Sequence, residues 1–221
     1  MANVLLGVTG SVAAIKTPQI YAGLKAAGHA VKVVATNASL YFFDPAELDP
    51  LDPRQPRRNL DVVILDEDEW PGRDEGRRYQ RGDDVRHIEL RRWADLLLLA
   101  PLDANTLAKL SIGMADNCLT CVWRARDAAR PAVLAPAMNT LMWQNVVTAR
   151  HLSQIASDTG FKGIASGDDP SLVAEAINAR RGPLRIVAPE SKQLACGDVG
   201  IGALAAPERI FAVVGESLKG R

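Results

Sequence analysis

The sequence predicts one three-layer α/β/α domain with a parallel central sheet, and three observations support this fold class. Short apolar runs alternate with helical patterns along most of the 221 residues, an order that places helices on both faces of one sheet. Residues 1–36 form a strand–helix–strand unit, which implies parallel strands joined by a right-handed crossover. The chain contains no internal repeat, and its length suits a single domain, residues 1–221, with one core.

The predicted strands are short apolar runs that read as buried segments. They lie at residues 4–8, 31–35, 62–65, 96–100, 132–135 and 184–187. The run at residues 96–100 (LLLLA) is the clearest of them, because it offers no polar face to solvent.

Helical patterns separate these strands, and local signals set some of their ends. Gly28 is a stop signal for the first helix, and Pro207 suits the first turn of the last one. The predicted helices cover about residues 12–27, 37–43, 103–112, 116–126, 141–157, 172–177 and 207–218. We expect the sixth of these to belong to an insertion over residues 162–182.

Residues 50–84 interrupt the alternation of strands and helices. The surrounding stretch contains five prolines and dense charges of both signs. Apart from the strand at residues 62–65, we therefore expect a mobile loop over residues 50–84, and we assign it no function.

Composition and charge exclude several classes of protein. The chain has 26 basic and 26 acidic residues and a formal net charge of zero, whereas nucleic-acid-binding surfaces carry a basic excess. The N-terminus lacks the basic region of a signal peptide, and no apolar run approaches the roughly 20 residues of a membrane span. The three cysteines are too few for a disulfide framework. We therefore expect a cytoplasmic protein that binds neither nucleic acid nor membranes.

A phosphate-binding turn is predicted where the first strand ends. Gly10, Ser11 and Val12 lie between this strand and the first helix, a position where backbone groups bind anions. The spacing is not the dinucleotide motif G-x-G-x-x-G, and no acidic residue follows the second strand to bind a ribose diol. A mononucleotide with one phosphate, such as FMN, therefore fits better than NAD. A tight turn without a ligand is the alternative.

Two further strand ends carry polar residues, and in a parallel sheet they lie along the same edge. Asp103, Ala104, Asn105 and Thr106 follow the fourth strand and supply donors and acceptors near a helix start. Simple capping of that helix is the alternative. Asn139 follows the fifth strand, and its amide can bind a substrate carboxylate. The sequence therefore predicts one ligand crevice along this edge.

His87 and Cys196 are the candidate proton-transfer residues. Histidine titrates near neutral pH, although an isolated histidine is more often a surface residue. Cys196 precedes three glycines within six residues, so we expect a flap over residues 190–205 that closes over a substrate. Cys118 and Cys121 share one helix face and lack a second cysteine pair for zinc. We interpret them as small core residues and predict no metal site.

In their order along the chain, these motifs resemble those of one family, the flavin-containing cysteine decarboxylases. The matching segments are residues 10–12, His87, residues 103–106, residues 136–143 (PAMNTLMW) and residues 195–197 (ACG). The resemblance covers nearly the whole chain, apart from residues 50–84 and 162–182, and indicates the phosphopantothenoylcysteine decarboxylases. It implies a Rossmann-like flavoprotein fold and a homotrimer with flavin sites between subunits, so that one site combines His87 with Asn139 of a neighbour.

The resemblance also implies an activity, the FMN-dependent decarboxylation of 4′-phosphopantothenoylcysteine to 4′-phosphopantetheine and CO₂ in coenzyme A biosynthesis. The cysteinyl thiol is oxidised to a thioaldehyde, CO₂ leaves, and the resulting enethiolate is reduced and protonated. Asn139 would hold the carboxylate, His87 would be the acid/base residue and Cys196 would donate the last proton. Met142 and Ala195 would also contact substrate. The residues implied for FMN are Gly10, Ser11, Val12, Thr36, Ser39, Phe42, Asp103, Ala104, Asn105, Thr106 and Ala137.

The sequence departs from the family pattern at Asp103, and other functions are alternatives to the decarboxylase. Asp103 stands where many relatives have Ser, so its contact with the flavin is less secure than that of its neighbours. One alternative is a non-catalytic, halotolerance-type regulatory subunit of a protein phosphatase, although this chain retains His87, Asn139 and Cys196. Another is a peptide cysteine decarboxylase, which shares the Asn motif. Flavin prenyltransferases share the fold but lack the Asn motif and the cysteine flap.

Overall fold

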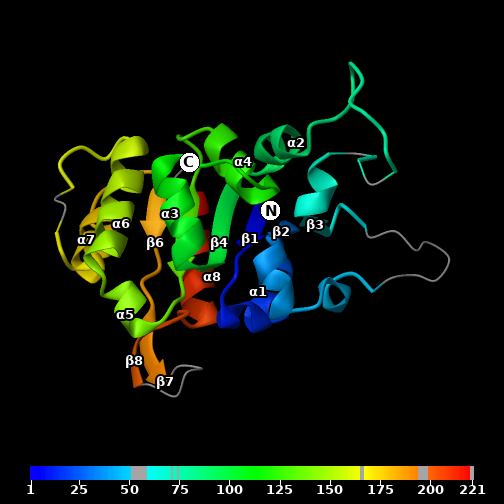
Figure 1. The fold of residues 1–221 in the computed structure, drawn as a ribbon. Coiled ribbons are helices and arrows are strands. Elements are labelled where there is room, and N and C mark those ends of the chain that lie inside the picture. Colours follow the sequence, from blue (N-terminus) through cyan, green and yellow to red (C-terminus); the bar gives the residue numbers. More distant parts are fainter. Residues whose placement is uncertain (51–58, 71, 74, 165–166, 194–198, 220–221) are drawn as a thin grey trace.

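A six-stranded parallel sheet lies at the centre of the computed structural model (Figure 1). The structure describes residues 1–50, 59–70, 72–73, 75–164, 167–193 and 199–219. The strand order is β3-β2-β1-β4-β5-β6. The strands are β1 (Asn3–Val8), β2 (Ala30–Ala35), β3 (Val63–Leu65), β4 (Leu96–Leu102), β5 (Ala132–Pro136) and β6 (Leu184–Ile186). The predicted parallel α/β/α fold is confirmed, and all six strands lie where the apolar runs predicted them.

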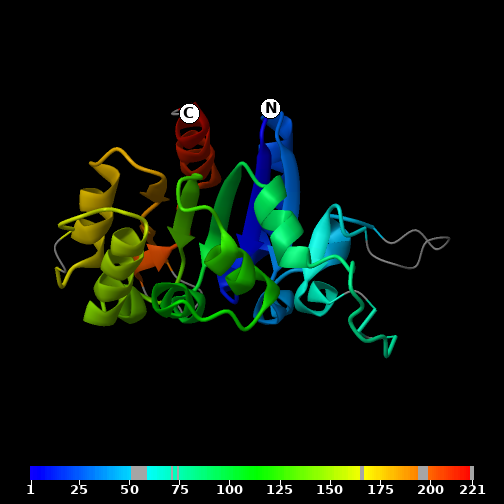
Figure 2. The same ribbon diagram turned by 90° about the horizontal axis from the view of Figure 1, so that it is seen from above.

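Helices cover both faces of the sheet, and each face has its own hydrophobic core (Figure 2). Neighbouring strand residues alternate between the two cores: Leu5 and Leu99 belong to one, and Leu6 and Leu98 to the other. The second core is covered by α1 (Thr17–Ala26) and α8 (Pro207–Lys219). The first is covered by α2 (Arg86–Trp93), α3 (Ala104–Ile112), α4 (Cys118–Ala125), α6 (Val146–Asp158) and α7 (Pro170–Asn178).

The helix predicted over residues 12–27 is divided in the structure. A 3₁₀ helix, η1 (Val12–Lys16), comes first, and α1 then begins at Thr17. Pro18 lies in the first turn of α1, where a residue without an N–H is tolerated because that turn has no helical acceptor for it. The shorter helix predicted after the second strand is the 3₁₀ helix η2 (Asn37–Tyr41), and η3 (Pro45–Glu47) follows it.

The helix predicted over residues 141–157 is also divided, and this division shapes the site. The short helix α5 covers Thr140–Trp143, and α6 begins after Asn145. The Asn145 side chain accepts a hydrogen bond from the Val147 N–H at 2.9 Å, so it starts a new helix instead of continuing the first. Amphipathic spacing alone could not reveal this break, because the apolar positions continue through it.

The stretch expected to be a mobile loop contains a 3₁₀ helix in addition to the predicted strand. Strand β3 forms within the predicted range, and the 3₁₀ helix η4 (Asp66–Glu69) follows it directly. Glu69 is only 3% exposed, which the charged sequence around it did not indicate. Residues 51–58, 71 and 74 of this stretch lie outside the described residues.

The segment predicted as an insertion contributes to the core. Helix α7 extends the predicted helix at both ends and packs against α6 and β6. Val173, Ala174 and Ile177 are buried on its inner face. Residues 165–166 of this segment lie outside the described residues.

A two-stranded antiparallel hairpin, β7 (Glu190–Gln193) and β8 (Val199–Ala203), lies beyond the carboxyl edge of the sheet (Figure 1). The Met138 N–H donates to the Gly202 carbonyl at 3.0 Å, which joins β8 to the loop after β5. A Cβ on Gly202 would lie 2.2 Å from the Met138 carbonyl oxygen, so this close approach requires glycine. Within the described residues, no helix is long and apolar enough to cross a membrane.

Candidate active site

A cleft of about 520 Å³ opens at the carboxyl edge of the sheet, between the loops after β1, β4 and β5 and the hairpin strand β8. Small-molecule sites of open α/β sheets lie at this edge. The predicted residues that line it are Gly10, Ser11, Val12, Phe42, Asp103, Ala104, Asn105, Ala137, Asn139 and Met142. Lining residues that the sequence analysis did not single out are Ala13, Ile15, Lys16, Met138, Lys192, Gly202, Ala203 and Leu204.

The turn after β1 is packed tightly and closes one side of the cleft. Ser11 caps η1, and its Oγ accepts from the Ala13 N–H at 3.3 Å. A Cβ on Gly10 would lie 2.7 Å from the Ala38 Cβ, so the turn can pack against η2 only because residue 10 is glycine. The backbone of this turn is therefore held at the rim of the cleft.

Thr9, which the sequence analysis missed, ties this turn to the loop after β4. Its hydroxyl donates to the Pro101 carbonyl at 3.0 Å and accepts from the Asp103 N–H at 2.7 Å. Its own N–H donates to the same carbonyl at 3.2 Å. Thr9 is fully buried, so its polar groups are satisfied by these contacts. Two motifs more than 90 positions apart are thereby fixed relative to each other.

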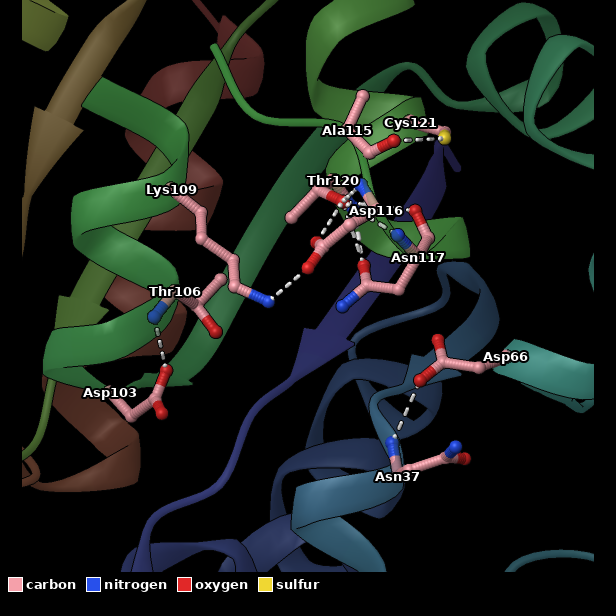
Figure 3. Close-up of polar contacts among 10 residues, drawn as sticks. All are labelled: Asn37, Asp66, Asp103, Thr106, Lys109, Ala115, Asp116, Asn117, Thr120 and Cys121. Atoms are coloured by element: carbon pink, nitrogen blue, oxygen red, sulfur yellow. Dashed lines mark hydrogen bonds and ion pairs between the residues drawn. The ribbon is translucent and has the colours of Figure 1, made fainter. Parts of the chain in front are cut away.

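The loop after β4 caps a helix, as Figure 3 shows, and also lines the cleft. The Asp103 carboxylate accepts from the Thr106 N–H at 2.9 Å and caps α3. Thr106 is buried and does not line the cleft, whereas Asp103, Ala104 and Asn105 do. The capping alternative therefore applies to Asp103. The Asn105 side chain is exposed at the cleft.

Thr36 and Ser39 do not line the cleft. The Ser39 hydroxyl is buried and donates to the Thr36 carbonyl at 2.7 Å, which accounts for it structurally. The Thr36 Oγ1 is buried and has no hydrogen-bond partner among the described residues. Phe42, further along the same segment, reaches the cleft.

Asn139 is held at the cleft by its own helix cap. Its Oδ1 accepts from the Leu141 N–H at 2.9 Å, and its carbonyl accepts from the Trp143 N–H at 2.9 Å. Trp143 is fully buried and anchors α5. Leu141 and Met142, in contrast, are exposed around the cleft.

His87 lies elsewhere in the chain. It is the second residue of α2, and its Nδ1 contacts the Oε1 of Glu69 in η4. The Trp70 ring meets the imidazole edge-to-face, with 6.5 Å between the ring centroids. His87 does not line the cleft, and α2 lies at the top of the molecule in Figure 1, whereas α5 lies at the lower left. Within one chain, the structure does not bring His87 and Asn139 together.

The two cysteines of α4 lie on the same side of the molecule as His87. Cys118 is fully buried, as predicted, and burial and the neighbouring Glu69 carboxylate raise the pKa of its thiol. Cys121 is only half-buried, so its assignment to the core was wrong. Its Sγ lies 3.7 Å from the Ala115 carbonyl (Figure 3). Burial and the Glu69, Asp116 and Asp66 carboxylates raise the pKa of the Cys121 thiol.

The predicted flap is described only in part. Ala195 and Cys196 lie outside the described residues, between β7 and β8. Lys192 on β7 lines the cleft and pairs with Glu190 at 2.6 Å. Glu190 also accepts from the Ala206 N–H at 3.0 Å, and these contacts lower the pKa of its carboxyl. Both hairpin strands therefore contribute to the cleft, β7 through Lys192 and β8 through Gly202 and Ala203.

Comparisons with known proteins agree with this geometry. The model of the flavoprotein family matches residues 1–219. A phosphopantothenoylcysteine decarboxylase of Oryza sativa subsp. japonica is 41% identical over 96% of this chain and 79% of its own length. One of Mus musculus is 40% identical over 96% of this chain and 85% of its own length. The chain therefore belongs to the flavoprotein family.

Two solved structures extend the comparison to three dimensions. A PPC decarboxylase mutant complexed with pantothenoylaminoethenethiol has a TM-score of 0.75 and 38% identity, and the match covers 99% of this chain and 98% of that one. The FMN-binding protein AtHal3 has a TM-score of 0.72 and 39% identity, covering 100% of this chain and 98% of that one.

Proposed function

We propose that this chain catalyses the FMN-dependent decarboxylation of 4′-phosphopantothenoylcysteine to 4′-phosphopantetheine and CO₂, a step of coenzyme A biosynthesis. The observation that carries this proposal is the cleft itself. It joins a glycine turn, a polar loop, the Asn139 loop and the hairpin strands β7 and β8. The similarity to relatives named for this activity supports the same assignment. A cytoplasmic location suits a chain with three cysteines and no disulfide framework.

The residues of the cleft fit FMN. Its volume of about 520 Å³ lies in the range of small-molecule sites, and the buried Thr36 Oγ1 has no hydrogen-bond partner among the described residues. When bound, FMN supplies a two-electron acceptor that oxidises the substrate thiol and later returns the electrons. The residues proposed to hold it are Gly10, Ser11, Val12, Thr36, Ser39, Phe42, Asp103, Ala104, Asn105, Thr106 and Ala137. Of these, Thr36, Ser39 and Thr106 do not line the cleft.

Asn139 is suited to hold the substrate carboxylate. Its Oδ1 accepts from the Leu141 N–H. Its Nδ2 group carries N–H donors, which are the groups that bind an anion. Fixing the carboxylate orients the bond that breaks when CO₂ leaves the thioaldehyde. Met142, exposed beside Asn139, would contact the pantothenoyl chain.

A complete site requires a second copy of the chain. His87 and Asn139 lie apart within one chain, so we propose a homotrimer in which His87 of one subunit faces Asn139 of the next. Exposed apolar side chains around the cleft, among them Ile15, Leu141 and Met142, support a subunit contact at this face.

Glu69 is the positioning residue for His87. The buried carboxylate accepts from the Nδ1 side of the imidazole, which directs the other ring nitrogen away from Glu69. This arrangement fixes the ring for proton transfer at Nε2. Cys196, on the segment between β7 and β8, would protonate the enethiolate in the last step.

The proposal is tested by the purified chain's absorption spectrum and by mass analysis after 4′-phosphopantothenoylcysteine is added. We expect bound flavin, CO₂ release and a product with the mass of 4′-phosphopantetheine. Cys196→Ser should stop at the unsaturated enethiol, because the last proton donor is missing. A colourless protein that does not bind added FMN would overturn the proposal. Conversion of a cysteine-terminated peptide in place of 4′-phosphopantothenoylcysteine would reassign the substrate.

A further inference from the structure

Three potential metal ligands meet at the corner of the molecule that holds His87. Glu69 comes from η4, His87 from α2 and Cys121 from α4. One ligand atom from each residue, a carboxylate oxygen, an imidazole nitrogen and a thiol sulfur, lies within 4.8 Å of the other two. In sequence they are separated by 18 and 34 positions, so no short ligand motif indicates them. We propose that these three side chains bind one soft divalent cation of the Zn²⁺ class, and that the bound cation inhibits the enzyme.

The ligand set selects the type of cation. Thiolate and imidazole ligands favour Zn²⁺ and Cd²⁺ over Mg²⁺ and Ca²⁺, which prefer oxygen. Three protein ligands with one open position are a common zinc arrangement. Zinc sites separate their ligand atoms by less than 4.8 Å, so these side chains must move closer together when the cation binds.

The Glu69 carboxylate gives the strongest evidence for a bound cation, because one of its buried oxygens has no hydrogen-bond partner among the described residues. It is 3% exposed, and its Oε1 faces His87. Its Oε2 is buried and has no hydrogen-bond partner among the described residues. Burial of a carboxylate oxygen without a partner is costly, and a coordinated cation would satisfy it.

The charges around the corner favour a cation. The carboxylates of Asp66 and Asp116 act electrostatically on Cys121, in addition to Glu69. Two basic side chains of these elements pair with other carboxylates: Lys109 pairs with Asp116 at 2.6 Å, and Arg86 pairs with Glu89 at 2.8 Å. His87 and Cys121 are both partly exposed, so a cation can enter from solvent.

Binding changes the protonation of two ligands. The Cys121 thiol loses its proton to solvent and forms the S–Zn bond. His87 coordinates as the neutral imidazole through the nitrogen that faces Glu69, and its remaining proton is on the other ring nitrogen. The metal thereby takes the place of the Glu69–His87 hydrogen bond. Because the imidazole is then fixed as a ligand, it cannot exchange protons with substrate, and turnover falls.

The first experiment measures binding without turnover. The flavin-loaded protein is titrated with Zn²⁺ by calorimetry and with Cd²⁺ by the ultraviolet absorbance of the thiolate–cadmium bond. We expect one ion per chain, and Cys121→Ser should weaken binding by about tenfold or more, because the thiolate is one of only three ligands. Cys196→Ser and His151→Gln are the matched controls for the other thiol and another histidine, and both should bind as the parent protein does.

The second experiment measures decarboxylation of 4′-phosphopantothenoylcysteine with increasing Zn²⁺. Cys121→Ser should keep the basal rate of the parent protein and resist inhibition by about tenfold more Zn²⁺. Unchanged zinc affinity in Cys121→Ser, loss of binding in Cys196→Ser, or no binding at all by the parent protein would overturn the site. This inhibitory role relies on the proposed function, but the binding experiment does not, so a protein that binds Zn²⁺ without decarboxylating would refute only the function.

Discussion

The cleft and the His87 corner are built in different ways. The cleft consists of loops that each follow a strand of one sheet, and most of its contacts are local, such as the Asp103 and Asn139 caps. The corner is assembled from η4, α2 and α4, and its central contact joins Glu69 to His87 across 18 positions. A site composed of local motifs can be found from sequence, whereas one composed of distant segments needs the fold. The comparison also shows that the two halves of the proposed chemistry lie apart in one chain.

The largest effect is expected in the cleft, from Asn139→Ala. Removing a group that orients a reacting carboxylate should lower turnover by about 100-fold or more. Loss of the α5 cap should also cost about 1 kcal/mol of the free energy of unfolding. The measurements are the rate of CO₂ release and the denaturation midpoint.

Asn145→Ala is the matched control for Asn139→Ala. Asn145 caps α6 with the same 2.9 Å bond geometry but does not line the cleft. It should show the same loss of stability and near-normal turnover. Equal loss of activity in both variants would reduce Asn139 to a structural cap.

The next effect is expected at the corner, from Glu69→Gln. A positioned acid/base residue contributes about 10²–10⁴-fold to a rate, and we expect loss of its partner to remove about 10- to 100-fold of that. Nitrogen NMR of His87 should show that Glu69 fixes the ring proton on Nδ1, and that this preference weakens in the variant.

Glu89→Gln serves as the control on the same helix as His87. Glu89 pairs with Arg86 at the surface, so its loss should leave both the rate and the His87 tautomer unchanged. A tautomer that is the same in Glu69→Gln and the parent protein would argue against positioning by Glu69.

A smaller effect is expected from Gly202→Ala, which tests the hairpin over the cleft. The new Cβ would lie 2.2 Å from the Met138 carbonyl, and Gly202 has a φ of +151°. Displacement of β8 should lower kcat/KM by about tenfold, through a higher KM and a lower kcat, because displacing site residues by about 1 Å slows the reaction. Gly215→Ala, where nothing lies within 4 Å of the new Cβ, should instead stabilise α8 by about 0.5–1 kcal/mol. The two variants are compared by steady-state kinetics and thermal unfolding.

The smallest effect concerns stability near the corner. Burial raises the pKa of the Asp66 carboxyl, despite a hydrogen bond from the Asn37 N–H at 3.0 Å (Figure 3). Because the folded state holds the proton more tightly, the contribution of Asp66 to stability is full below its unfolded pKa and is lost as pH rises through the folded pKa. Asp66→Asn should therefore flatten this decline in the free energy of unfolding.

Asp61→Asn should change the pH dependence in the opposite direction. The hydrogen bond from Lys32 and its charge lower the pKa of Asp61, so its contribution is present above the unfolded pKa and is lost as pH falls through the folded pKa. Urea denaturation of both variants across the acidic range measures the two slopes. The same slope in both would contradict the assigned environments.

Much of the fold follows from local pattern, and the failures have physical reasons. Six apolar runs predicted six strands, because buried parallel strands leave no polar face. The breaks at Pro18 and Asn145 were missed, because one depends on a missing N–H and the other on a side-chain cap within a continuing apolar pattern.

The candidate site was predicted in the same uneven way. Ten predicted residues line the cleft, since motifs at strand ends share one edge of the sheet. Thr9 and Glu69 were missed, because their roles come from partners 92 and 18 positions away. A buried acidic residue in a charged stretch carries no local signal of its partner.

The central claim, that each site combines His87 of one subunit with Asn139 of another, is tested most directly by mixing two inactive variants. His87→Ala and Asn139→Ala are co-expressed with different tags, and trimers that carry both tags are assayed. In every trimer that carries both tags, one of the three intersubunit sites regains both residues, so activity should recover to about one third of the parent level, well above the sum of the separate variants. Mixed oligomers with no more activity than that sum would place His87 and Asn139 in the same chain's site, or remove one of them from the chemistry.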